Sequence, residues 1–142
     1  MRKRMVMLIL CGVLTLAGNA QVFAEDIADM ASMVVSPRMD YIDFASANLI
    51  IDSAGNATIR CSAQGYSGTT TRMEISAKLQ RYVDGKWVTL KTFTANSNSY
   101  SVSLRDSYKV SKGYTYRVRA TVHAYSGSSV ETRTVTSSEV NY

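Results

Sequence analysis

The stretch RMEISAKLQRYVDGKWVTLKTF, residues 72–93, alternates apolar and polar side chains on both sides of an Asp-Gly pair. Alternation with a period of two places successive side chains on opposite faces of a β-strand. Asp84-Gly85 tolerates the positive backbone angles of a two-residue hairpin turn. The stretch therefore predicts two antiparallel strands, at about residues 72–82 and 86–93. The apolar face of the first of them consists of Met73, Ile75, Ala77 and Leu79.

The same alternation continues on both sides of this hairpin, between clusters of turn-forming residues. No segment of ten or more residues has the 3.6-residue apolar period of an amphipathic helix. Further strands are predicted at about residues 41–51, 57–65, 100–104, 114–124 and 130–140. The side chains predicted to face inward are Ile59, Cys61 and Ala63 in the second strand, Tyr100, Val102 and Leu104 in the fifth, and Tyr116, Val118, Ala120 and Val122 in the sixth.

Seven short strands within roughly a hundred residues favour an all-β fold with a single core. One sheet with this alternation would leave an apolar face in water, so two sheets are needed to cover each other. We therefore predict a seven-stranded antiparallel sandwich. A small β-barrel is the structural alternative.

The segment Lys112-Gly113-Tyr114-Thr115-Tyr116-Arg117-Val118 resembles the entry to the sixth strand of immunoglobulin-like and fibronectin type III domains. In those domains a tyrosine two residues before an inward aliphatic side chain caps the corner through its hydroxyl, and Tyr116 matches this position. Cys61 lies about where an immunoglobulin domain has its first bridging cysteine, but the opposing position is Val118. The resemblance thus implies a disulfide-free, fibronectin-like sandwich.

Three further segments resemble a group of small secreted proteins of Gram-positive bacteria that has no established activity. They are PRMDYI at residues 37–42, LQRYVDGKW at residues 79–87 and VSKGY at residues 110–114. The resemblance covers residues 37–142 and implies secretion and a sandwich domain. It implies no mechanism.

Residues 1–24 have the three parts of a secretory signal peptide: a basic start, an apolar run and a small-residue exit that ends at Ala24. The apolar run is shorter than the roughly 20 residues that span a bilayer. We expect a secreted, extracellular protein without a membrane span after cleavage, with a flexible tail at residues 25–36 and one domain at residues 37–142. A lipid anchor at Cys11 and an uncleaved N-terminal anchor are the alternatives.

The formal charge of +5 lies largely in the leader, which holds three of the 16 basic residues and no acidic one, so the remaining chain has a charge of +2. Its basic residues are spread among acidic ones without a run of five. A groove that follows nucleic-acid phosphates needs gathered charges. We therefore expect an unknown protein or glycan partner at the cell surface and no nucleic acid; the sequence leaves the oligomeric state open.

Residues for catalysis or metal binding are sparse. His123 is the only histidine and is predicted to face outward, and after cleavage Cys61 is the only cysteine. A hydrolase needs a base, a nucleophile and an orienting group, and a zinc site needs three or four ligands. We therefore expect no catalytic residue, no metal, no cofactor and no enzymatic activity. We expect Cys61 to be a small buried residue, with an exposed thiol in a linked dimer as the alternative.

The tripeptide Tyr-Ser-Gly follows the second predicted strand and again the sixth, at residues 66–68 and 125–127. In an immunoglobulin-like sandwich these two loops emerge at one end. Aromatic rings with adjacent hydroxyls are typical of loop-based recognition, so the candidate binding residues are Tyr66, Ser67, Tyr125 and Ser126. The alternative is that Ser-Gly only forms turns and each tyrosine covers a strand end.

Trp87, the sole tryptophan, has two interpretations. It is either a core residue beside Leu79 and Leu90 or an exposed stacking residue for sugar rings. With Tyr116 and Cys61 it completes the set of expected structural residues. The main functional hypothesis is a non-enzymatic module that binds a surface glycan or protein; an extracellular assembly or matrix subunit and a bacteriocin-like effector are the alternatives.

Overall fold

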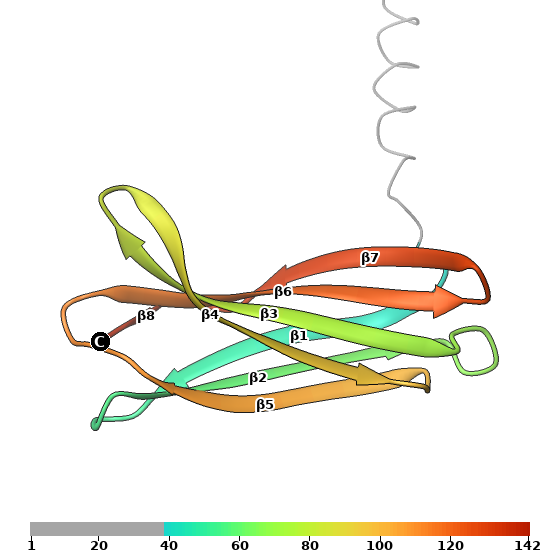
Figure 1. Cartoon of the computed structure of the whole chain (residues 1–142), viewed down its shortest axis with the longest axis horizontal. Coiled ribbons are helices and arrows are strands. Elements are labelled where there is room, and N and C mark those ends of the chain that lie inside the picture. Colours follow the sequence, from blue (N-terminus) through green and yellow to red (C-terminus); the bar gives the residue numbers. More distant parts are fainter. Residues whose placement is uncertain (1–38) are drawn as a thin grey trace, which may run out of the picture. The chain divides into compact units, whose positions relative to one another are not determined.

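A computed structural model describes residues 39–142, which form antiparallel strands and turns and contain no helix (Figure 1). The expected signal peptide, the tail at residues 25–36 and the alternatives at Cys11 lie outside these residues. No helix able to cross a membrane occurs in the described part. The strands are β1 (Ile42–Ile51), β2 (Asn56–Gly65), β3 (Arg72–Val83), β4 (Lys86–Ser97), β5 (Ser101–Lys109), β6 (Thr115–Ser126), β7 (Ser129–Thr136) and β8 (Val140–Asn141).

The strands form two sheets, with the orders β1-β2-β5 and β4-β3-β6-β7, and β8 pairs with the start of β6. The sheets are not closed into a barrel, so the sandwich prediction is confirmed and the barrel alternative is wrong. In an immunoglobulin constant domain the fourth strand joins the sheet of the first two. Here β4 pairs with β3, which gives the fibronectin type III-like arrangement.

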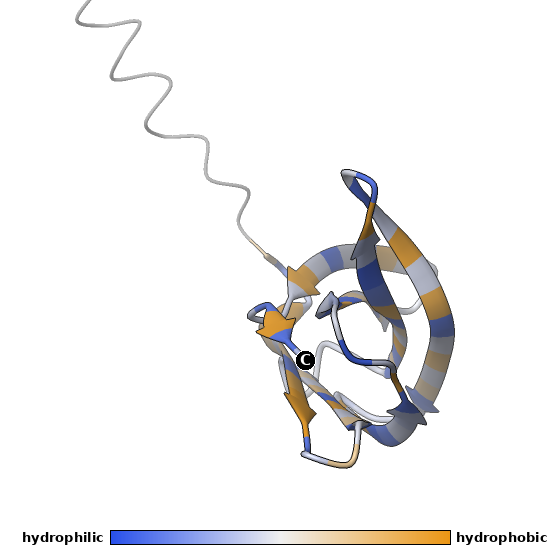
Figure 2. Ribbon diagram, turned by 90° about the vertical axis from the view of Figure 1, so that its left-hand side faces the viewer, coloured by the Kyte–Doolittle hydropathy of each residue, from blue (hydrophilic) through white to orange (hydrophobic). Residues whose placement is uncertain are grey.

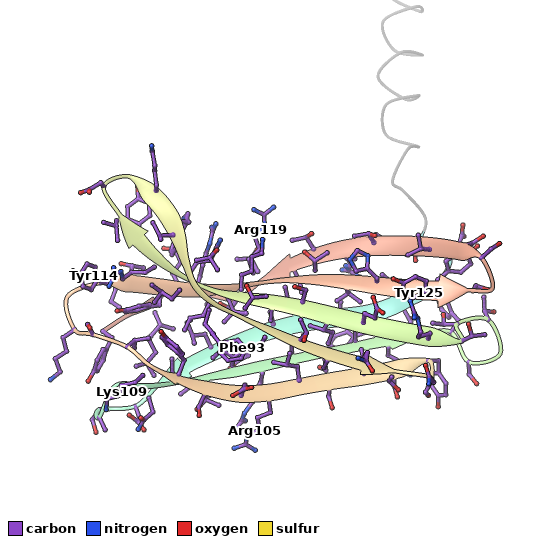
Figure 3. The ribbon with its side chains drawn as sticks, viewed as in Figure 1. Phe93, Arg105, Lys109, Tyr114, Arg119 and Tyr125 are labelled. Carbon is purple, nitrogen blue, oxygen red and sulfur yellow. The ribbon has the colours of Figure 1, made fainter. Side chains whose placement is uncertain are left out.

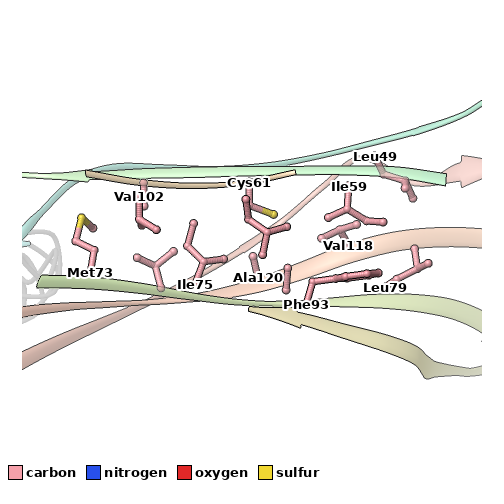
Figure 4. Close-up of a cluster of buried hydrophobic side chains, with 14 of the residues drawn as sticks. Leu49, Ile59, Cys61, Met73, Ile75, Leu79, Phe93, Val102, Val118 and Ala120 are labelled. Carbon is pink, nitrogen blue, oxygen red and sulfur yellow. The ribbon is translucent and has the colours of Figure 1, made fainter. Parts of the chain in front are cut away.

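The core lies between the sheets and is filled by every second side chain of the long strands, an alternation visible as bands along the ribbons in Figure 2. Figure 4 shows the two sets facing each other across the core, Leu49, Ile59, Cys61 and Val102 from one sheet and Met73, Ile75, Leu79, Phe93, Val118 and Ala120 from the other. The inward sets predicted for the second, third and sixth strands are all buried.

The β3–β4 hairpin turns at Asp84 and Gly85, whose φ angles of 49° and 77° are those of a two-residue turn with two positive values. The hairpin also contains a bulge, because the register shifts between Leu79, which pairs with Lys91, and Gln80, which pairs with Thr89. The hairpin stands away from the rest of the sandwich at one end (Figure 1). Its second strand is longer than predicted and continues past Phe93 to Ser97.

Two local predictions are wrong. Tyr100 was expected to face inward, but its side chain is 39% exposed, because the chain bends there before β5 begins at Ser101. The last strand, expected to be continuous over residues 130–140, is interrupted between β7 and β8. At this break Ser137 exchanges hydrogen bonds with Val118, both through its own backbone N–H and through its hydroxyl.

Tyr116 closes the start of β6. Its side chain is fully buried, and its hydroxyl donates a 2.6 Å hydrogen bond to the carbonyl of Ser111 in the preceding crossover. This is the contact by which the tyrosine corner of immunoglobulin-like sandwiches fixes the chain entering the sixth strand.

A single carboxylate joins the sheets where β1 passes β7. Glu131 on β7 accepts hydrogen bonds from three consecutive backbone N–H groups: Asp40 at 2.9 Å, Tyr41 at 2.8 Å and Ile42 at 2.7 Å. These two strands belong to different sheets, so no ladder connects them. Glu131 therefore satisfies the amides of the two residues that lead into β1 and of its first residue, in place of a neighbouring strand.

Candidate functional site

The two Tyr-Ser-Gly segments lie at the same end of the sandwich, on the right in Figure 1. Tyr66 opens the β2–β3 loop, whereas Tyr125 is still part of β6. The loop docks on β6, because the N–H of Thr71 donates to the carbonyl of Tyr125 at 2.8 Å. Ser67 is exposed in the loop, and Ser126 pairs with Ser129 across the β6–β7 turn.

The two tyrosines do not form a common aromatic surface. Within residues 39–142, no ring contact or hydrogen bond joins Tyr66 to Tyr125. Tyr66 is 43% exposed. Tyr125 lies instead on the outer face of its sheet, where the guanidinium of Arg72 is 4.0 Å from the ring centre and the hydroxyl donates to Glu74 at 2.9 Å.

Arg72 and Glu74 are also ion-paired, at 3.2 Å, so the two groups that contact Tyr125 are themselves joined. A ring fixed in this way covers the end of β3 and β6, as in the alternative interpretation of the Tyr-Ser-Gly segments. Of the two expected rings, only Tyr66 is without such contacts in the described part of the chain.

Trp87 is half-buried on the outer face of its sheet, and the core interpretation is wrong. Trp87 and Leu90 are three positions apart on one strand, so a period of two places them on opposite faces. Leu90 takes the inner side and packs against the core. Trp87 is paired with Tyr82 across the hairpin, beyond the end of the core.

Trp87 belongs to a connected cluster that we call the Trp87 platform, made of Gln80, Tyr82, Trp87 and Arg117. The Tyr82 and Trp87 ring centres are 5.1 Å apart at an angle of 55°, and the Arg117 guanidinium is 4.0 Å from the Trp87 ring. Arg117 also donates to the side-chain oxygen of Gln80 at 2.9 Å. The contacts with Tyr82 and Arg117 thus fix the orientation of the Trp87 ring in the absence of a ligand.

The Trp87 platform borders a depression of about 400 Å³ that is lined by Tyr82, Trp87, Thr115 and Glu139. Tyr82 is 46% exposed. The depression therefore offers two aromatic rings, a hydroxyl and a carboxylate within one region. Apolar surface with a few convergent polar groups is the usual composition of a small-ligand site.

His123 is half-buried on β6, and its Nδ1 is 2.9 Å from the hydroxyl of Thr132. A catalytic histidine is usually hydrogen-bonded to a nucleophile and to an orienting carboxylate. Within residues 39–142, no three His, Cys, Asp or Glu side chains lie close enough to hold a metal ion.

Cys61 is a free thiol that points into the core with 3% of its surface exposed. Burial raises the pKa of the Cys61 thiol to about 11, so the reactive thiolate is scarce at neutral pH. We expect native protein at pH 8 to leave Cys61 unlabelled by dithionitrobenzoate and to label it promptly in denaturant. Peptide mapping separates this thiol from Cys11; rapid labelling of Cys61 in the native protein would contradict the buried position.

Comparison with protein-family models and with curated proteins finds no match to this chain.

Proposed function

We propose that this protein is an extracellular, non-enzymatic β-sandwich module that binds a surface glycan through the Trp87 platform. The observation that carries the proposal is the contact between exposed Tyr82 and half-buried Trp87 on the outside of the sheet, beside a depression with hydrogen-bonding groups. The predicted secretory leader supports the extracellular location.

A sugar ring presents C–H groups on its faces and hydroxyls around its edge. Tyr82 and Trp87 match the faces, because aromatic rings bury apolar surface and keep a polar group at the rim. Thr115 and Glu139, which line the depression, supply a donor and acceptors for the hydroxyls. The stacking of Arg117 on Trp87 holds the ring in place, which reduces the entropy lost when a ligand binds.

The test is binding to purified cell-wall polysaccharide and to a glycan array by a Tyr82→Ala and Trp87→Ala double variant. We expect at least a tenfold loss of affinity, equivalent to about 1.4 kcal/mol, as for a central aromatic contact. Tyr108→Ala is the matched control, since Tyr108 is an exposed ring on β5, outside the platform.

Two outcomes would reject the platform. Unchanged glycan affinity in the double variant would show that the rings do not contact the ligand. A loss confined to the variant Tyr66→Ala with Tyr125→Ala would instead assign the site to the Tyr-Ser-Gly end of the sandwich.

A further inference from the structure

Each sheet carries two cations directly opposite each other on its outer face. Arg60 on β2 pairs with Arg105 on β5, and Lys78 on β3 pairs with Arg119 on β6. All four side chains are exposed. Directly opposed residues on neighbouring strands have Cβ atoms about 5 Å apart, and like charges in that position repel. Each pair therefore opposes the pairing of the strands that carry it.

The protein itself does not neutralise these pairs. Within residues 39–142 the one ion pair is that of Arg72 with Glu74. β1 and β5 each carry one exposed carboxylate, Asp43 and Asp106, and neither forms an ion pair within residues 39–142. On β3 and β6 the only acidic residue is Glu74, which Arg72 engages. An exposed cation without an ion-pair partner can form charge-assisted hydrogen bonds with an anion from outside the protein.

A row of hydroxyl side chains lies next to each cation pair. On the first face the adjacent register row consists of Ser46, Ser62 and Ser103. On the second face the adjacent row consists of Thr94, Ser76, Thr121 and Thr134. The two sheets thus repeat one arrangement, a pair of cations beside a line of hydroxyls.

Both rows border depressions in the surface. Ser62 and Ser103 line one of about 490 Å³, together with Phe44, Gln64 and Asn96. Ser76 and Thr94 line another of about 310 Å³, together with His123 and the ion-paired Glu74. Each face therefore offers cations for the anionic groups of a ligand and, next to them, Ser or Thr hydroxyls for its hydroxyl groups.

The two faces point away from each other, as the side chains of Arg105 and Arg119 show in Figure 3. Packed sheets are about 10 Å apart, and these side chains extend outward from both. Their charged groups are therefore separated by more than the Debye length of about 8 Å at physiological ionic strength. The faces act as independent sites, and one short ligand cannot occupy both.

We propose that each face binds an anionic polysaccharide and that one molecule of this protein bridges two such chains. Carboxylate or sulfate groups pair with the cations, and sugar hydroxyls pair with the Ser and Thr rows. Single-stranded nucleic acid needs aromatic rings between its phosphate contacts, and these rows have none. The inference does not rest on the Trp87 platform, because the β1-β2-β5 face binds without it.

The first test is calorimetric titration of the protein with a short heparin oligosaccharide. We expect two oligosaccharides per protein molecule, one on each face. Each single-face variant, Arg60→Gln with Arg105→Gln or Lys78→Gln with Arg119→Gln, is expected to bind one. The variant with all four changes loses binding at least tenfold. The control, Lys86→Gln with Lys112→Gln, removes the same charge from the start of β4 and from the β5–β6 crossover, and keeps the original stoichiometry.

The second test is light scattering after the protein is mixed with long heparin chains. The original protein is expected to link chains into large particles, whereas each single-face variant binds the chains without linking them. Thermal melting checks folding, and removal of a repelling pair is expected to leave the melting temperature unchanged or raised. Neutral dextran is expected to give neither binding nor particles.

Three results would overturn the inference. They are particle growth with both single-face variants, an equal loss of binding in the control, and affinity for duplex DNA at least equal to that for heparin at 150 mM salt. The last two would show a response to net charge alone, and the first would assign the linking to association between copies of the protein.

Discussion

Replacing Tyr116 with alanine is expected to lower the free energy of unfolding by about 3–5 kcal/mol, the usual effect of removing a large buried ring. The side chain is fully buried, and its ring meets that of Tyr114 edge to face at 6.4 Å. The change leaves a cavity at the start of β6 and removes the hydrogen bond to Ser111. Urea denaturation followed by tryptophan fluorescence measures the effect.

Tyr116→Phe distinguishes the contribution of the hydroxyl to stability from that of the ring. It retains the packing and removes only the 2.6 Å hydrogen bond, so we expect a loss of about 1–2 kcal/mol. Tyr114→Phe is the control, since Tyr114 is partly exposed. Equal stability of Tyr116→Phe and the original protein would show that the corner contact contributes nothing.

The second large effect is expected from Glu131→Ala, with a loss of about 2–3 kcal/mol. Hydrogen bonds to a charged group are stronger than neutral ones, and this carboxylate accepts three of them. Amide exchange measured by NMR gives a local readout, and we expect faster exchange at Asp40, Tyr41 and Ile42.

Glu131→Gln retains one side-chain acceptor, so we expect a smaller destabilisation and partial protection of the same amides. Glu139→Ala serves as the matched control because Glu139 is exposed between β7 and β8. If Glu131→Ala leaves exchange at the start of β1 unchanged, the carboxylate does not hold that strand.

The period-two pattern predicted β2, β3 and β6 well, because their inward positions hold apolar residues, but it failed at Tyr100 and in the interrupted last strand. Ile59, Cys61 and Ala63 are buried as their alternation with polar neighbours predicts. The tight turn at Asp84-Gly85 was predictable for a similar reason, since few residue pairs tolerate two positive φ angles. For Trp87 the core interpretation conflicts with its position three residues before Leu90, since a period of two places the two side chains on opposite faces of one strand.

The candidate sites depend on contacts between strands, which a single sequence does not specify. Arg117 lies over Trp87, and Arg60 lies opposite Arg105, only because particular registers bring these positions together. In the sequence the same cations are scattered. The two arrangements require the pairing of β3 with β6 and of β2 with β5, strands that are far apart in the sequence.

Cys61 has a consequence for the conditions under which this fold persists. It is the only cysteine in residues 39–142 and it is free, so this part of the chain contains no bond that a reductant breaks. Small exported domains commonly depend on disulfides, and hence on an oxidising compartment, to remain folded. This sandwich relies on its apolar core, Tyr116 and Glu131 instead, so its structure is independent of the redox potential of its surroundings.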